Sequence, residues 1–377
     1  MRPIVQKEFF LNRRFLWLII STSLLFSFGL LMVFNTTSAE MIDRGIFANT
    51  HEVFYKQFFY GGVGILLGLA AYRTGYLRLM RSSGWFLIFM SVVLALLFVP
   101  GIGLAVNGAR RWISVFGYRF QPSEIVKLVI PMYYVHWYLQ QETPILFKPF
   151  LKMLSLLSLP IGLILLEPDN GTTVIIFATL LILFLLTRIR WVYWALPFLL
   201  LVGIGGSIAY HMPHVHDRIE IYLHPEQDLR GKGHQPHQAK IAAGSGQLLG
   251  RGLGESLQKL NYLPEARNDY IAAIYAEETG FIGILLLIGL YMSFTYAGFL
   301  VAIKAPDRAS FLLASILTFL ISIQAFLNLG IVSGLLPSKG MTLPFFSQGG
   351  SSLIVNTVAL FLLLDIARKA KKNLYSS

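Results

Sequence analysis

The feature that most limits how this chain can fold is a series of long apolar runs that carry few charges. Ten such runs follow one another along the 377 residues: 15–34, 58–72, 85–99, 125–139, 151–166, 172–187, 191–210, 279–303, 310–334 and 350–366. A bilayer core about 30 Å thick is crossed by roughly 20 apolar residues of helix. Only 13% of the residues are charged and 55% are apolar, whereas soluble domains are about 25% charged. We therefore expect an all-α integral membrane protein with about ten transmembrane helices, forming one polytopic domain over residues 1–377.

The basic residues of the short connections predict the orientation of the chain. Basic residues near the ends of spans resist translocation, so the side richer in Lys and Arg is cytoplasmic. That side carries Arg2, Lys7, Arg13, Arg14, Arg73, Arg78, Arg81, Lys148, Lys152, Arg188, Arg190, Lys304, Arg308, Arg368, Lys369, Lys371 and Lys372. Both termini are then expected in the cytoplasm. Arg110, Arg111 and Arg119 are exceptions on the other side, which invites a functional interpretation.

The net charge of +12 agrees with this orientation, because an anionic inner leaflet attracts each nearby Lys or Arg by about 1 kcal/mol. Nucleic acid is therefore not an expected partner. The chain has no cysteine, which excludes disulfides and thiolate metal sites.

One connection is much longer than the others. Residues 211–270, between the seventh and eighth spans, form a polar, glycine-rich loop that the topology places outside the cell. Its histidines, His211, His214 and His216 among them, have spacings that could seat a metal, but a solvated loop with incidental histidines is the favoured interpretation, and we predict no obligatory metal site. Its glycines between 244 and 254 follow no strand, so a flexible or re-entrant backbone that lines a cavity is expected rather than a phosphate cradle.

The end of this loop places an acid at the mouth of a span. Asp269 is followed at once by apolar sequence, and either it or Asn268 could simply cap the next helix. Glu277 and Glu278 lie two turns further on and are expected to be structural.

Two opposite charges lie inside the fourth run. Glu124 and Lys127 are three residues apart, so they share one helix face and can pair. Charges in a membrane helix are costly and normally face a partner or a wet cavity. The pair is therefore a candidate site, with a purely structural ion pair as the alternative.

Several polar turns converge on the predicted extracytoplasmic side. They are the turn at 167–171, the segment 337–344 with Lys339, and the segment 347–352 with Ser347, Ser351 and Ser352. Each alone could be ordinary turn chemistry. Together with Arg110 and Arg111, they predict one outward cavity suited to an anionic lipid-linked substrate.

These motifs resemble, in order and over essentially the whole chain, the SEDS family (shape, elongation, division and sporulation) of bacterial membrane proteins. The resemblance rests on 107–112 (NGARRW), 121–124 (QPSE) with Lys127, 167–169 (EPD), 235–238 (QPHQ), 263–266 (LPEA), 343–347 (LPFFS) and 349–352 (GGSS). The amino-acid sequences of 106–112 and 338–344 are more similar to those of the division members than to those of the elongation members. The chain departs from the family at Arg267 and Asn268, where His-Thr is usual, at Tyr270, which replaces Phe, and at Gln348, which replaces Tyr.

The resemblance implies an inverting peptidoglycan glycosyltransferase of the bacterial inner membrane that polymerises lipid II during division. It implies a class B penicillin-binding protein and other division proteins as partners, and it allows a divalent cation, Mg²⁺ or Mn²⁺, as a cofactor. Asp269 falls on the essential aspartate of the family and is expected to be the general base. The expected substrate-binding residues are Glu124, Lys127, Arg110, Arg111, Lys339, Ser347, Ser351 and Ser352. A lipid II flippase and a non-catalytic division scaffold are the alternatives.

Overall fold

The computed structural model of the protein describes residues 2–43, 51–106, 109–115, 117–142, 144–195, 233–259, 267–337 and 340–373, together with residues 199, 203, 207 and 222. Most of them are helical. The helices are α1 (Arg2–Asp43), α2 (His51–Thr74), α3 (Tyr76–Leu96), α4 (Pro122–Leu139), α5 (Phe147–Leu166), α6 (Asn170–Leu186), α9 (His234–Ser245), α10 (Ile271–Ile303), α11 (Arg308–Val332) and α12 (Gly350–Asn373).

The length and hydropathy of these helices confirm a multi-pass membrane protein. Within the described residues, seven helices are long and apolar enough to cross a membrane: α2, α3, α5, α10 and α11 whole, Phe15–Ser38 of α1 and Gly350–Ala370 of α12. The apolar helix α6 is shorter. The number of ten spans stays a prediction, because most of the run at 191–210 lies outside the described residues.

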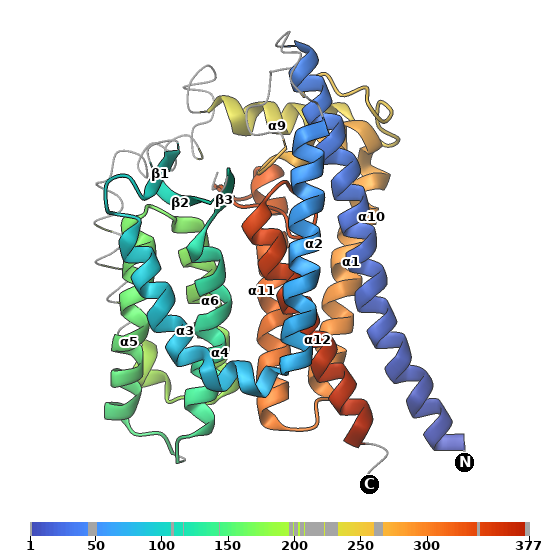
Figure 1. Ribbon diagram of the computed structural model, residues 1–377. Helices are drawn as coiled ribbons and strands as arrows, with labels where there is room; N and C mark the ends of the chain where they lie inside the picture. Colours follow the sequence, from blue (N-terminus) through green and yellow to red (C-terminus); the bar gives the residue numbers. More distant parts are fainter. Residues whose placement is uncertain are drawn as a thin grey trace.

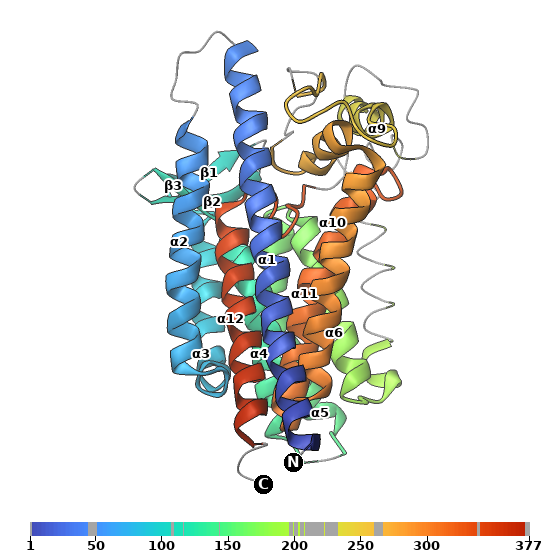
Figure 2. The same ribbon diagram turned by 90° about the vertical axis from the view of Figure 1, so that its right-hand side faces the viewer.

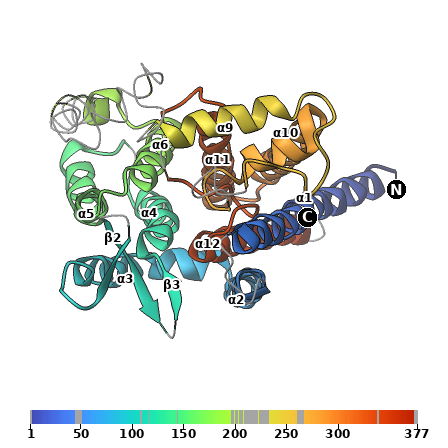
Figure 3. The ribbon, with the colours of Figure 1, turned by 90° about the horizontal axis from the view of Figure 1, so that it is seen from above.

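The helices run roughly parallel, and the two ends of the bundle differ. Both chain termini lie at one end, which we call the terminal end (Figures 1 and 2). At the opposite end, which we call the sheet end, α9 and the strands cover the helices (Figure 1). Figure 3, seen from above, shows α9 lying across the ends of α10 and α11, and α2 beside α12.

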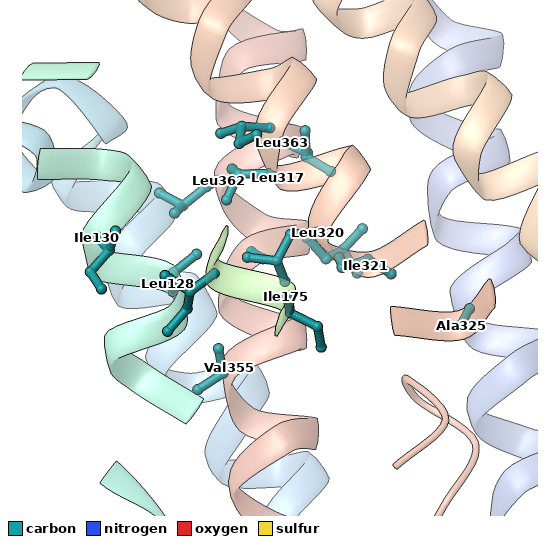
Figure 4. Packing of buried hydrophobic residues seen from close by; sticks show 14 of the residues in the cluster. Leu128, Ile130, Ile175, Leu317, Leu320, Ile321, Ala325, Val355, Leu362 and Leu363 are labelled. Carbon is teal, nitrogen blue, oxygen red and sulfur yellow. The ribbon is translucent and has the colours of Figure 1, made fainter. Parts of the chain in front are cut away.

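Small residues let some of these helices approach closely, as is usual in membranes. A Cβ on Gly68 of α2 would overlap the ring of Phe361 of α12, and one on Gly64 would crowd Thr357. The core between α4, α6, α11 and α12 is tightly filled by aliphatic side chains (Figure 4). Those labelled there include Leu128, Ile130, Ile175, Leu317, Leu320, Ile321, Val355, Leu362 and Leu363, all buried.

The connection between α3 and α4 contains a small antiparallel sheet, so the expectation of an all-helical chain was wrong here. Its strands are β1 (Gly103–Val106), β2 (Ala109–Val115) and β3 (Tyr118–Phe120), in the order β1-β2-β3. Ile113 at the centre pairs with Gly103 on one side and Phe120 on the other. The sheet places Arg110 and Arg111 at the end of the bundle where α10 begins.

Helix α10 is broken near its start. Gly280 has φ 70° and ψ −165°, which interrupts the helical hydrogen bonds. The backbone N–H groups of Arg251 and Gly252 donate to the freed carbonyls of Glu277 and Glu278, both at 3.0 Å. In return, the N–H of Phe281 donates to the Gln247 carbonyl at 2.9 Å. Of the two expectations for the glycine segment, a flexible or a re-entrant backbone, the flexible one was wrong, because the segment is an ordered turn packed on the break.

Candidate functional site

The pair predicted from the spacing of Glu124 and Lys127 is present. The Lys127 ammonium donates to Glu124 Oε2 at 2.6 Å, and the Lys127 side chain has no exposed surface. It also donates to Gln324 Oε1 of α11 at 2.8 Å. With these two acceptors, the buried charge is well solvated by the protein.

Gln324 extends this contact towards the segment that precedes α12. Its amide donates to the carbonyl of Thr342 at 2.9 Å, and the Thr342 hydroxyl donates to Ser352 Oγ at 3.0 Å. Asn356, one turn further along α12, also donates to Ser352 at 3.2 Å. A chain of polar contacts therefore joins α4, α11 and α12.

A second branch begins at the N-terminus of α4. Asp169, the N-cap of α6, accepts hydrogen bonds from Ser123 Oγ at 2.9 Å and from the Gln121 amide at 3.0 Å. The backbone N–H of Gln121 donates to Ser351 Oγ at 2.8 Å. The turn at 167–171 and the Gly-Ser segment thus meet at the start of α4. The outward cavity expected from these turns stays a prediction.

Asp269 lies beside the same segment of chain. Its carbonyl accepts from the Asn328 amide of α11 at 2.9 Å, and the same amide donates to the Met341 carbonyl at 2.6 Å. A Cβ on Gly340 would be 3.1 Å from Asp269 Oδ2, so this carboxylate lies directly against the turn that carries Gly340. Asp269 is half-buried and precedes α10, with Tyr270 as the N-cap residue.

The two arginines of β2 have different surroundings. Arg110 is exposed, whereas Arg111 donates to the carbonyls of Glu167 and Pro168 at 2.9 and 2.5 Å. Both carboxyl oxygens of Glu167 are buried without a hydrogen-bond partner. Burial, and secondarily the charge of Asp169, raises the pKa of the Glu167 carboxyl to about 8.

Glu277 and Glu278 are structural, as expected. Glu278 accepts from Lys259 Nζ at 2.9 Å and from the Asn35 amide of α1 at 2.5 Å. Glu277 accepts from Ser256 Oγ at 2.5 Å. The two carboxylates fasten the turn at 247–259 to the first part of α10.

The remaining predicted residues are either buried serines or lie outside the described residues. Ser347, Ser351 and Ser352 are buried, and Ser347 Oγ accepts from the Leu343 N–H at 2.8 Å, which is a turn contact. Lys339, His211, His214 and His216 lie outside the described residues. Among the residues that the structure describes, no group of three His, Cys, Asp or Glu side chains is placed to hold a metal ion.

Gln324 and Asn328 were missed at the sequence level. They lie four residues apart in an apolar run, so they share one face of α11, and both are buried. Polar residues inside a membrane helix normally mark a partner or a site. The spacing of these two polar residues could therefore have identified them as candidate site residues.

The family is decided by a match over nearly the entire chain. The family model described as "Cell cycle protein" (FtsW, RodA and SpoVE) matches residues 15–372. The chain belongs to this FtsW/RodA/SpoVE family. This is the SEDS family that the motifs resembled, and its members are multi-pass proteins of the bacterial inner membrane.

Curated relatives cover almost the same length. The protein named "Probable peptidoglycan glycosyltransferase FtsW" of Trichlorobacter lovleyi is 35% identical over 98% of this chain and 97% of its own. Its namesake in Coxiella burnetii is 38% identical over 93% and 95%. The "Stage V sporulation protein E" of Bacillus subtilis is 32% identical over 94% and 97%.

Solved structures share the fold. A chain from "Structural coordination of polymerization and crosslinking by a peptidoglycan synthase complex" has a TM-score of 0.73 at 24% identity, with 94% of this chain and 97% of that chain covered. The rod shape determining protein RodA of Thermus thermophilus has a TM-score of 0.66 at 24% identity, with 93% and 96% covered. At this identity, the likeness concerns the fold alone.

Proposed function

We propose that this protein is a peptidoglycan glycosyltransferase that polymerises lipid II into glycan strands during bacterial cell division. The observation that carries the proposal is the polar network at the sheet end, which joins the Glu124–Lys127 pair through Gln324 to the segment at 340–352. Asn328 joins the same segment to Asp269. Relatives at 35–38% identity are named as probable peptidoglycan glycosyltransferases. The sheet end is extracytoplasmic in this proposal.

Asp269 is the proposed general base. The hydroxyl of the acceptor sugar attacks the anomeric carbon of the donor, its proton passes to the Asp269 carboxylate, and the bond from that carbon to the diphosphate oxygen breaks. One displacement inverts an α-linked donor to a β-linked product, so no covalent intermediate is required. The Asn328 contact supports this role, because it fixes the backbone of Asp269.

The leaving diphosphate requires positive charge nearby. Arg110 is exposed and can reach a substrate, whereas Arg111 is held by two carbonyls. The Lys127 ammonium is enclosed by Glu124 and Gln324, so we assign it the positioning of the network around the substrate. Lys339, next to Gly340, is a further proposed contact, and the hydroxyls of Ser347, Ser351 and Ser352 support the shape of the cavity.

A divalent cation is compatible with this arrangement if the substrate diphosphate supplies most of its ligands. Mg²⁺ is usually held by one or two carboxylates together with substrate phosphates. Such an ion would be held mainly by the diphosphate itself, and it would offset the charge of the leaving group while Asp269 remains available as the base.

We propose a class B penicillin-binding protein as the partner, together with other division proteins. The fold similarity to a chain of a peptidoglycan synthase complex supports this proposal.

Asp269→Asn tests the proposed base. Asn has nearly the same shape as Asp but cannot take a proton, and Tyr270 rather than Asp269 is the N-cap of α10, so folding and lipid II binding should persist while polymerisation falls by a factor of about 10²–10⁴. The measurement is glycan-chain formation from fluorescent lipid II by the purified variant with its penicillin-binding partner, alongside thermal stability.

The matched control is Asp307→Asn. Asp307 caps α11 at the terminal end, where its carboxylate accepts from the Ser310 N–H at 2.8 Å, so this variant should polymerise normally. Near-normal polymer from Asp269→Asn would remove Asp269 as the base. Lipid II transport across vesicles by a protein that makes no polymer would favour a flippase, and neither activity would favour a scaffold.

A further inference from the structure

The terminal end of the bundle contains a cavity that the proposed reaction does not use. Its volume is about 270 Å³, and it lies where α4 and α6 end and α11 begins. The connections that border it lie at the end with both termini (Figure 1). Three of its eight lining residues are arginines, namely Arg188, Arg190 and Arg308.

The three guanidinium groups carry uncompensated charge. All three residues are exposed, and within the described part of the chain no carboxylate lies within 4.0 Å of any of them. The nearest acid in sequence, Asp307, is engaged elsewhere. Its carboxylate accepts from the N–H and hydroxyl of Ser310, both at 2.8 Å. The described wall of the cavity therefore carries three positive charges and no carboxylate.

Arg308 is held in place by an aromatic ring. Its guanidinium lies 5.0 Å from the centre of the Tyr138 ring, which is also part of the cavity wall. This cation–π contact orients the group without neutralising its charge. Arg308 also lies in the first turn of α11, where the helix dipole favours an anion.

Arg188 occupies a backbone position that normally favours glycine. Its φ is 54°, and the N–H of Ile189 donates to the Phe184 carbonyl at 3.1 Å, which ends α6 in a Schellman motif. A left-handed conformation costs a residue with a Cβ roughly 1–2 kcal/mol. The arginine side chain is kept here at the expense of backbone strain, and such strain clusters at ligand sites.

Apolar side chains beside the cavity indicate that its ligand is a lipid. Leu146, Trp191 and Val192 are 68%, 70% and 56% exposed and follow directly on residues of the cavity wall. Trp is typical of the membrane–water interface, so the arginines lie at the depth of the headgroups. A ligand with a phosphate and acyl chains satisfies both parts of this surface, and a soluble anion satisfies only one.

We propose that this arginine cavity binds the phosphodiester headgroup of an anionic glycerophospholipid. The three guanidinium groups take the phosphate oxygens, and the acyl chains lie along Leu146, Trp191 and Val192. The bound lipid links the end of α6 to the start of α11.

The experiment measures lipid retention by the detergent-purified full-length protein, using native mass spectrometry and thermal stability. The probes are short-chain phosphatidylglycerol, zwitterionic phosphatidylcholine and inorganic phosphate. Phosphatidylglycerol should bind and stabilise, and the other two should not. Each arginine near a headgroup contributes roughly a fivefold change in affinity. The triple variant with Gln at Arg188, Arg190 and Arg308 should therefore bind phosphatidylglycerol about 100-fold more weakly.

Two variants keep this test interpretable. Arg78→Gln removes an exposed arginine of the same end outside the cavity and should leave phosphatidylglycerol binding unchanged. Arg188→Gly relieves the backbone strain, so it should bind phosphatidylglycerol about fivefold more weakly while remaining at least as stable without lipid. Unchanged phosphatidylglycerol binding in Arg188→Gly and in the triple variant overturns the proposal. Equal stabilisation by inorganic phosphate would also overturn it, because the site would then serve a soluble anion.

Discussion

Removal of the Lys127 ammonium is the most direct test of the network at the sheet end. Lys127→Met keeps most of the side-chain volume but takes the positive charge from Glu124, whose side chain is only 11% exposed. It also leaves Gln324 Oε1 without the donor that lies 2.8 Å away. Breaking one partner of a buried pair costs about 3–5 kcal/mol, which is roughly a 10²–10⁴-fold change in the unfolding equilibrium.

The double variant Glu124→Gln with Lys127→Met removes both charges together. Replacing a buried ion pair by neutral groups of similar volume is often close to neutral, so most of the lost free energy of unfolding should return. The double variant, like Lys127→Met, should nevertheless polymerise poorly, because Gln324 still lacks the Lys127 donor that positions the network around the substrate. Stability and activity are thereby separated.

The assay is reversible unfolding in mixed detergent, followed by tryptophan fluorescence. The matched control is Lys56→Met, which breaks a pair of the same 2.6 Å length to Glu52 on the surface of α2, where both side chains are exposed. Surface pairs contribute little, so no measurable change is expected. If Lys127→Met is as stable as Lys56→Met, or if the double variant is no better than Lys127→Met alone, the pair does not stabilise the fold as argued.

Two further predictions concern the sheet end. The pKa of the Glu167 carboxyl is about 8 in the folded protein and 4.5 at its ordinary value, so the folded state binds the proton more tightly. The free energy of unfolding should therefore fall as pH rises from 4.5 to about 8 and then level off. Glu167→Gln should remove this slope when unfolding is measured as a function of pH. Gly250 and Gly254 both have positive φ, but only at Gly250 would a Cβ overlap a neighbour, the Glu278 carbonyl. Gly250→Ala should therefore lose clearly more stability than Gly254→Ala, which should lose roughly 1–2 kcal/mol, and equal losses would contradict the packing described here.

Hydropathy predicted the helical spans well, because lipid solvation imposes apolar runs directly on the sequence. It could not predict the elements at the sheet end, which are solvated by water and by each other. Helix α9 is only 12 residues long and mixes polar residues with alanines, and the strands of the sheet are only 3–7 residues long. Neither carries a periodicity strong enough to identify it in advance.

The candidate site could be predicted where charge and spacing coincide, as at Glu124 and Lys127. It could not be predicted where the partners are neutral and lie in different segments, as for Gln324 with the Thr342 carbonyl or Asn328 with the Asp269 carbonyl. Such contacts follow from the packing of α11 against the segment before α12. The role of Asp269 remains a prediction for the experiment above, and the roles of Arg110 and the serines also remain predictions.

The break in α10 at Gly280 should make the position of Asp269 independent of the thickness of the bilayer. The short part of α10 before Gly280 is fastened to the turn at 247–259, while the long part after Gly280 packs against α1 and α11 and should tilt together with them. A span that meets a thinner or thicker membrane adjusts mainly by tilting. The carboxylate should therefore keep its place relative to the sheet in membranes of different thickness, and the rate of polymerisation should depend little on acyl-chain length.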